Sequence, residues 1–268
     1  MQKGYLYPDT GDGITASFIT TKEPYRGYWE KSEKHLLNMM TKVMQRHTVG
    51  SADAWLLDAG CGTGRLLPGF EKYFNHILAI DPDPTQIEKA QRNVSELGFD
   101  NKVVFQATPI EKLSWKEESI DAILCSHILQ HMNTATVHLA MQRFRSFLKE
   151  RGLLFITTTH SRRDSDYYVK AYLKHSNVVE KEVEKEEFNA LVSNGKGILP
   201  IHFFSMRSIT GELEESGFVV RDIRSYHVLG KVPIVDRLVD RDSLINSTIL
   251  LKKRFGRDMF VFAQKIGG

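Results

Sequence analysis

The sequence predicts an α/β fold built on a doubly wound, mostly parallel sheet with an antiparallel C-terminal edge and a helical insertion. Between residues 54 and 159, short apolar runs alternate with stretches of helical periodicity, and a glycine cluster follows the first run. After Thr159 this alternation of apolar runs and helical periodicity stops. Regular strand–helix repeats produce parallel strands with helices on both faces. With 268 residues the chain could hold one large domain or two small ones, and we expect a single domain over 1–268.

The elements follow from local pattern. Apolar residues that recur at helical spacing predict a first helix over 28–47. Strands are expected at 54–57, 77–80, 103–105, 120–125 and 153–159, with helices at 65–74, 84–98 and 136–149 between them. Pro84 and Gly98 suit the two ends of their helix. A helix over 206–217 and strands over 218–223 and 258–265 would close the sheet as an antiparallel hairpin, and residues 236–253 could hold a further helix.

The stretch after the fifth strand departs from this alternation. Residues 160–200 are polar and carry a charge run from Glu180 to Glu187, which favours a helical insertion over sheet. A solvated helix face explains such a run more simply than a binding patch does. The single domain then divides into an N-terminal lid and helix (1–50), a cofactor-binding core (54–159), a lid-like insertion (160–205) and a C-terminal helix with strands (206–268).

Composition and charge argue against several classes of protein. A net charge of +3 and a pI near 8.7 disfavour a nucleic-acid partner, which calls for concentrated positive charge. The longest apolar runs, such as 153–156, are far shorter than the roughly 18 residues of a membrane span. The N-terminus has no basic segment followed by an apolar one, and Cys61 and Cys125 form no metal-type spacing. We therefore expect a cytoplasmic protein without structural disulfides or bound metal.

The strongest local signal is the run Asp58-Ala59-Gly60-Cys61-Gly62-Thr63-Gly64 at the end of the first strand. Alternating glycines let the backbone turn tightly and approach a ligand closely. The nicotinamide fingerprint G-x-G-x-x-G fails here, because its third glycine would fall on Arg65 or Leu67. Asp81 ends the second strand. A carboxylate at that place can accept hydrogen bonds from both hydroxyls of a bound ribose, as it does in dinucleotide-binding folds.

This D-x-G-x-G-x-G run with Asp81 resembles the class I S-adenosylmethionine-dependent methyltransferases. The resemblance implies a Rossmann-like, seven-stranded sheet and S-adenosylmethionine as the cofactor. The cofactor-binding residues that it implies are Asp58, Gly60, Cys61, Gly62, Gly64, Asp81, Pro82, Thr108, Pro109, Ile110, Ser126 and His127. Thr108-Pro109 departs from the family, which often has an Asp–Ala pair there. Gln130-His131 stands where many small-molecule members have Glu–His, so one candidate carboxylate is lost.

The histidines are the candidates for contact with a methyl acceptor. Methyl transfer is an in-line displacement, so alignment matters most, and a base is needed only for an acceptor that holds its proton. His131 is the candidate catalytic residue. The candidate substrate-binding residues are Tyr28, Gln130, His131, His160 and His202. Tyr28 lies in a stretch resembling the segment that closes over the cofactor, although a core aromatic explains it equally well. His127 and His131 have a zinc-type spacing but no nearby acid, which disfavours a metal site. For His127 a structural or cofactor-packing role is favoured over catalysis.

The acceptor is expected to be a small molecule bound under a lid built from residues 1–35 and 160–205. After the fourth strand the chain has Ser126-His127-Ile128-Leu129, not the [DNS]-P-P-[YF] motif of enzymes that methylate base amino groups. Cys125 follows Leu124 and lacks the Pro-Cys pattern of cytosine-carbon enzymes. A peptide or protein acceptor remains open. A nicotinamide-dependent oxidoreductase is disfavoured, and a non-catalytic cofactor-binding scaffold is a third reading.

Overall fold

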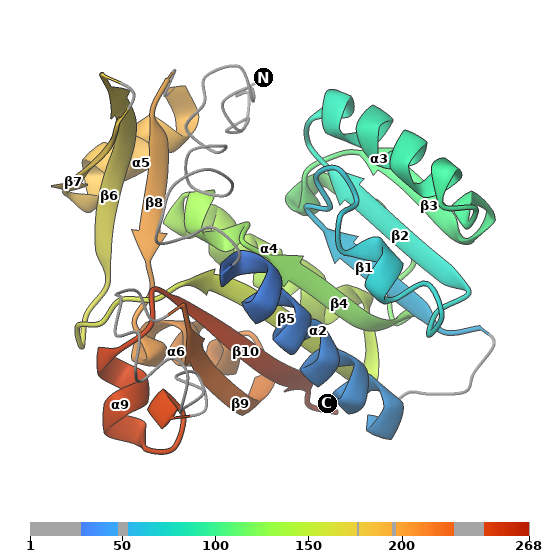
Figure 1. Cartoon of the computed structure of the whole chain (residues 1–268). Coiled ribbons are helices and arrows are strands. Elements are labelled where there is room, and N and C mark those ends of the chain that lie inside the picture. The colour runs from blue at the N-terminus through green and yellow to red at the C-terminus, as the bar shows by residue number, and fades with distance from the viewer. Residues whose placement is uncertain (1–27, 48–52, 176, 195–196, 228–243, 268) are drawn as a thin grey trace.

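The computed structural model describes residues 28–47, 53–175, 177–194, 197–227 and 244–267 (Figure 1). Most of the expected N-terminal lid, residues 1–27, lies outside these described residues. The same holds for residues 228–243, which include the start of the helix considered within 236–253; the described part of that range contains α9 (Ile249–Arg254).

The main sheet has seven strands in the order β3-β2-β1-β4-β5-β10-β9. Its members are β1 (Trp55–Ala59), β2 (His76–Asp81), β3 (Val103–Ala107), β4 (Ile120–Ser126), β5 (Leu148–Thr159), β9 (Phe218–Tyr226) and β10 (Asp258–Lys265). The first five strands pair in parallel, and β10 pairs antiparallel with both β5 and β9. The predicted seven-stranded, doubly wound sheet with an antiparallel C-terminal edge is therefore confirmed.

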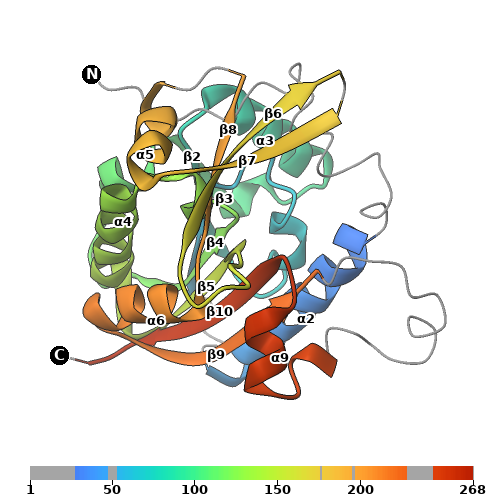
Figure 2. The same ribbon diagram turned by 90° about the vertical axis from the view of Figure 1, so that its left-hand side faces the viewer.

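Helices cover both faces of this sheet (Figure 2). The helix α4 (Thr134–Phe147) and the helix α6 (Met206–Glu215) share one buried apolar cluster with the sheet. The helix α2 (Tyr28–His47) and the helix α3 (Pro84–Glu96) share a second cluster on the opposite face. Each helix lies within two or three residues of its predicted position, because its apolar residues recur at the spacing that one buried face requires. None of the helices described is long and apolar enough to cross a membrane.

The helix predicted over residues 65–74 is wrong. This stretch forms tight turns around a short 3-10 segment, η2 (Leu67–Gly69). Leu67, Phe70 and Phe74 are buried and produce the helical spacing in the sequence. Pro68 has no backbone N–H to donate and Gly69 weakens helix, so the backbone winds irregularly while it still buries these side chains.

The helical insertion predicted over residues 160–205 is also wrong in the main. A second, antiparallel sheet lies here in the order β7-β6-β8, and only α5 is helical. Its elements are β6 (Tyr167–Lys174), β7 (Asn177–Val183), α5 (Lys185–Asn194) and β8 (Leu199–Phe203). Val169 and Ala171 alternate with more exposed neighbours on β6, as a half-buried strand requires. The charge run falls partly on β7, an edge strand, where charged side chains are tolerated.

Candidate functional site

The glycine loop joins the end of β1 to the end of β2. The backbone N–H groups of Gly60 and Cys61 both donate to the Ile80 carbonyl at 2.8 Å. Gly60, Gly62 and Gly64 have φ values of +79°, +52° and +74°, which side-chain-bearing residues rarely adopt. A Cβ on Gly60 would lie 2.3 Å from Ile128 Cδ1, whereas a Cβ on Gly62 would meet nothing within 4 Å. The loop therefore needs glycine at 60 for packing and leaves open space beside Gly62.

Asp81 is held by backbone amides on both sides. Its Oδ2 accepts the N–H of Gly62 at 3.0 Å, and its Oδ1 accepts the N–H of Asp83 at 2.9 Å. Burial raises the pKa of Asp81, while these two amide hydrogen bonds lower it. Each carboxylate oxygen has a second lone pair, so the oriented group can still accept two hydroxyl protons from a diol.

Asp58 is a buried carboxyl with an unsatisfied oxygen. Its exposed fraction is 1%, and its Oδ2 has no hydrogen-bond partner among the described residues. Burial and then the negative charge of Asp81 raise its pKa to about 7, and Arg65 opposes this. An unsatisfied buried carboxylate oxygen is costly unless a ligand supplies a donor or a positive charge. These residues fit the α-amino, sulfonium and ribose groups of S-adenosylmethionine.

Cys61 lies within the loop without nucleophilic character. Its thiol is buried, its Sγ contacts the Gly62 carbonyl oxygen at 3.6 Å, and burial raises the thiol pKa. A protonated, buried thiol is inert, so Cys61 contributes shape to the loop.

The residues expected near an adenine ring lie at the ends of β2 and β3, which pair through Asp81 and Ala107. Pro82 is exposed, and Thr108 Oγ1 donates to the Pro109 carbonyl at 3.4 Å. Ile110 has an exposed fraction of 4% and packs into the core. The adenine contacts of these residues stay a prediction.

A chain of hydrogen bonds holds His127 after β4. Thr158 Oγ1 donates to Gln130 Oε1 at 3.1 Å, and Gln130 Nε2 contacts His127 Nδ1 at 3.2 Å. His127 Nε2 lies 3.0 Å from Tyr226 Oη. Burial lowers the pKa of His127 to about 4, so the ring is neutral at physiological pH. Because Gln130 donates to Nδ1, Nε2 is the protonated nitrogen and donates to Tyr226.

The neighbouring Ser126 and His131 have different partners. Ser126 Oγ lies 2.8 Å from Thr157 Oγ1, which links β4 to β5. His131 Nδ1 donates to the Pro200 carbonyl at 2.7 Å and so fastens the 3-10 turn η5 (Leu129–His131) to β8. Burial lowers the pKa of His131 to about 4. The catalytic and substrate-binding roles expected for His131 stay predictions, and its observed contact joins core and insertion.

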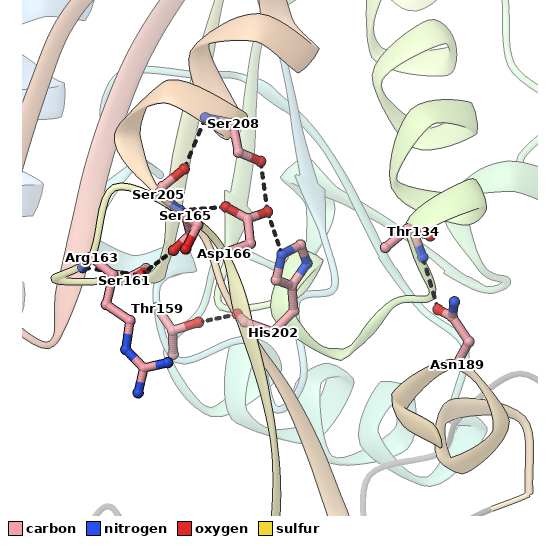
Figure 3. Close-up of polar contacts among 10 residues, drawn as sticks. All are labelled: Thr134, Thr159, Ser161, Arg163, Ser165, Asp166, Asn189, His202, Ser205 and Ser208. Carbon is pink, nitrogen blue, oxygen red and sulfur yellow. Dashed lines mark hydrogen bonds and ion pairs between the residues drawn. The ribbon is translucent and has the colours of Figure 1, made fainter. Parts of the chain in front are cut away.

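His202 lies at a second junction of the insertion with the core (Figure 3). Its Nε2 donates to Asp166 Oδ2 at 2.7 Å, and Asp166 also accepts Ser208 Oγ at 2.7 Å and the Ser205 N–H at 2.8 Å. Burial raises the pKa of Asp166, but the His202 hydrogen bond and charge bring it below its ordinary value. These contacts connect β6 and β8 to the start of α6, so His202 helps to anchor the insertion to the core.

Two adjoining cavities open at the carboxyl edge of the sheet. The first, the inner pocket, is lined in part by Leu66, Ser126, His127, Thr157, Tyr226 and His227. The second, the outer cleft, is lined in part by His160, Arg162, Tyr167, Phe203, His227 and Arg257. His227 lines both cavities, and its Nδ1 is hydrogen-bonded to the buried Asp258 carboxylate. His160 lines the outer cleft and His202 is not among its lining residues. The substrate-binding roles expected for both histidines stay predictions.

Several residues of these cavities are missing from the sequence prediction. Tyr226 is the last residue of a strand, β9, that was expected to stop at Ile223, and His227 follows that strand. Arg162 and Tyr167 were assigned to a helical insertion. A polar and aromatic run directly after a strand's carboxyl end is the signal that could have identified them. Tyr28 begins α2, and its side chain lies outside the described residues.

A family model described as a methyltransferase domain matches residues 57–156. The ubiquinone biosynthesis O-methyltransferase of Methylocella silvestris is 36% identical over 77 residues, which make up 29% of this chain and 29% of that protein. Across the relatives compared, the aligned part spans 29% to 51% of the relative's length. The chain therefore spans about half of these proteins or less.

Solved structures match over much more of the chain. An S-adenosylmethionine-dependent methyltransferase from Clostridium acetobutylicum has a TM-score of 0.59 at 12% identity, covering 96% of this chain and 97% of that chain. The 1,6-didemethyltoxoflavin-N1-methyltransferase of Burkholderia thailandensis, solved with bound 1,6-didemethyltoxoflavin and S-adenosylhomocysteine, has a TM-score of 0.56 at 15% identity, covering 98% of this chain and 92% of that chain. At these identities the likeness establishes the shared fold.

Proposed function

We propose that this protein, whose residues 57–156 match a methyltransferase domain, methylates a small-molecule acceptor with S-adenosylmethionine as the donor. One observation carries the proposal beyond the fold: the unsatisfied Oδ2 of buried Asp58 near a glycine loop that leaves open space at Gly62. A ligand that donates a proton or carries a positive charge would remove the cost of this uncompensated buried carboxyl.

The donor would be held by three parts of the site. Asp58 would face its positively charged methionine end, Asp81 would accept its ribose hydroxyls, and Gly62 would allow close backbone approach. The loops after β2 and β3, with Pro82, Thr108, Pro109 and Ile110, would flank the adenine. Bound S-adenosylmethionine supplies an electrophilic methyl group. The protein's contribution is then alignment, because displacement requires the acceptor atom in line with the bond that breaks.

The acceptor would enter through the outer cleft and reach the methyl group beside His227. His227 lines both the inner pocket, at the ends of β4 and β5, and the outer cleft beside the insertion, and this shared residue supports the proposed route. In this proposal residues 1–268 act as one domain and the sheet β7-β6-β8 forms one wall of the cleft. Gln130 and His131 would position the site through His127 and Pro200.

A small acceptor is favoured over a macromolecule by the lining of the outer cleft. Aromatic side chains and charged side chains surround it together: Tyr167, Phe203 and Phe255 with Arg162, Glu180 and Arg257. Sites for small molecules combine apolar walls with a few polar groups in this way. A peptide side chain is the second candidate, since it could enter from the open side. A cytoplasmic location is part of the proposal, because Cys61 and Cys125 are both buried thiols without a disulfide.

The test is production of S-adenosylhomocysteine by the purified chain. Incubation with S-adenosylmethionine and pools of small hydroxylated, amine and thiol compounds should give product that depends on one pool, and the Asp58→Asn variant should lose most of it. Product that forms only with peptide pools would establish the second candidate. Binding of S-adenosylmethionine without turnover in any pool would favour the scaffold reading and contradict the proposal.

A further inference from the structure

The ring of His160, directly after β5, has a defined protonation pattern. Its Nδ1 lies 3.2 Å from the Gly256 carbonyl oxygen and 3.4 Å from Ser225 Oγ. Ser225 Oγ donates its own proton to the Lys252 carbonyl at 2.6 Å, so both neighbours of Nδ1 accept hydrogen bonds. Nδ1 therefore carries the ring proton, and Nε2 carries a lone pair.

This lone pair is buried and has no protein partner. The exposed fraction of His160 is 1%, and Nε2 makes no hydrogen bond to any residue that the structure describes. Burial lowers the pKa of His160, so the ring is neutral and Nε2 stays an acceptor at physiological pH. Because His160 lines the outer cleft, a ligand in the cleft can supply the missing donor, an N–H or O–H group.

Arg162 brings a positive charge to the same cleft without a carboxylate to balance it. Arg162 and Arg257 both line the cleft, and Arg257 pairs with Glu180 at 2.6 Å. The exposed side chain of Arg162 makes no ion pair within the described part of the chain. A single uncompensated charge suits a monoanion, and a carboxylate matches the planar guanidinium.

His160 and Arg162 are close enough for one small ligand to reach both. They are two residues apart along the chain, so their Cα atoms lie within about 7 Å of each other. The charge of Arg162 also acts on the His160 ring, where it adds to the effect of burial and lowers the pKa further. A ligand that meets both residues must carry a negative group and a hydrogen-bond donor side by side.

The aromatic wall of the cleft offers no free ring face to such a ligand. The rings of Tyr167 and Phe203 stack on each other, with centroids 4.5 Å apart. On the outer sides of this stack, Arg163 lies over Tyr167 at 4.3 Å and Arg257 lies over Phe203 at 5.2 Å. Recognition beside these two rings therefore depends on charge and hydrogen bonds, not on stacking.

We propose that the outer cleft binds the methyl acceptor through a carboxylate, which pairs with Arg162, and through a neighbouring N–H or O–H group, which donates to Nε2 of His160. This inference rests on the proposed function and names its substrate class: a small carboxylic acid with a hydrogen-bond donor beside the carboxylate. A carboxylate alone would face the His160 lone pair, and a neutral donor alone would leave Arg162 without a counter-ion. Both residues bind and orient the acceptor, and neither exchanges a proton with it.

The first experiment compares three probes that differ from one another in a single group. N-acetylglycine has a carboxylate and an adjacent N–H. N-acetylglycinamide lacks the negative charge, and acetoxyacetate has an ester oxygen in place of the N–H. Each probe is titrated into the full chain saturated with S-adenosylhomocysteine, and NMR measures the Kd. We expect N-acetylglycine to bind about tenfold more tightly than either of the others, because each of them loses one interaction.

The second experiment assigns each preference to its residue. Arg162→Gln should abolish the preference for N-acetylglycine over its amide. The matched control Arg163→Gln removes an adjacent charge that is not among the described residues lining the cleft, so it should keep that preference. His160→Asn keeps an amide N–H for the Gly256 carbonyl but removes Nε2, and it should abolish the preference over acetoxyacetate. Binding of S-adenosylhomocysteine should be unchanged in all three variants.

The wild-type protein alone can contradict the inference. Equal affinity for N-acetylglycine and either of the other probes would overturn it, and so would no binding of N-acetylglycine. An acid preference that survives in Arg162→Gln would also overturn it. If His160→Asn does not fold, the wild-type comparison of N-acetylglycine with acetoxyacetate still decides whether a donor is required. Failure of the wild-type protein to bind S-adenosylhomocysteine is a separate result, and it would overturn the proposed function.

Discussion

Gly62 donates its backbone N–H to Asp81 Oδ2 at 3.0 Å, so the glycine loop itself orients the carboxylate that ends β2. We predict that Asp81→Ala weakens binding of S-adenosylhomocysteine by about 1–3 kcal/mol, because hydrogen bonds from the ligand to a charged group are lost. Calorimetry on the purified variant measures this change.

The control for that prediction is Asp83→Ala. Asp83 caps α3 by accepting the Thr85 N–H at 2.8 Å, so its loss should cost about 1 kcal/mol of stability. Its backbone N–H still holds Asp81, and ligand affinity should not change. Equal affinity of Asp81→Ala and the wild-type protein would rule out the ribose assignment.

A second prediction concerns Asp58 and the change in the free energy of unfolding with pH. Burial, with the charge of Asp81 as the next cause, raises its pKa from 3.8 to about 7 in the folded protein. Between pH 4 and 7 the folded state then binds a proton that the unfolded state has lost, so this group lowers stability as pH rises. Relative to Asp58→Asn, the wild-type free energy of unfolding should fall by up to about 4 kcal/mol across that range.

Urea unfolding of both proteins at several pH values measures this difference, and other titrating groups cancel in it. The ligand-free protein must be used, since a bound positive charge favours the ionised carboxylate. A constant difference between the two proteins from pH 4 to 7 would show that Asp58 is not perturbed as described.

Two glycines allow a matched comparison of backbone strain with ligand contact. Gly62 and Gly98 both have positive φ, +52° and +77°, and a Cβ at either position meets nothing within 4 Å. Gly62→Ala and Gly98→Ala should therefore each lose about 1–2 kcal/mol of stability. Only Gly62→Ala should also weaken S-adenosylhomocysteine binding. Calorimetry and thermal unfolding separate the two effects, and equal affinities would place the ligand away from the loop.

Gln130 determines the protonation of His127. Its amide donates to Nδ1 of a ring whose pKa is about 4 because of burial. Replacing it by a carboxylate, Gln130→Glu, should reverse that hydrogen bond and raise the His127 pKa by about 1–3. Titration of the ring by NMR follows this, with Gln130→Met as the uncharged control. If the pKa rises equally in both variants, the charge is not the cause.

The features that could be predicted from the sequence are those that local interactions determine. The loop from Asp58 to Gly64 and the acid Asp81 could be located because their spacing is fixed by one strand–turn unit. The five parallel strands could be located because strands covered on both faces are continuous apolar runs.

The errors arise where tertiary contacts decide the structure. Residues 65–74 have helical spacing, yet Pro68 and Gly69 leave the backbone irregular. The segment 177–183 contains the charged run Glu180-Lys181-Glu182 and does not predict a strand by itself. It forms a strand by pairing with β6. The outer cleft brings His160, Phe203 and Arg257 together from three separate segments, and no spacing in the sequence shows such a meeting.

The most direct test of the account is calorimetric titration of the full chain with S-adenosylmethionine and S-adenosylhomocysteine, with reduced nicotinamide dinucleotide as the control. We predict one binding site with a Kd in the micromolar range for both adenosyl ligands, weakened in Asp81→Ala, and no binding of the nicotinamide. A folded protein that binds neither adenosyl ligand, or that binds the nicotinamide instead, would contradict the assignment of the glycine loop.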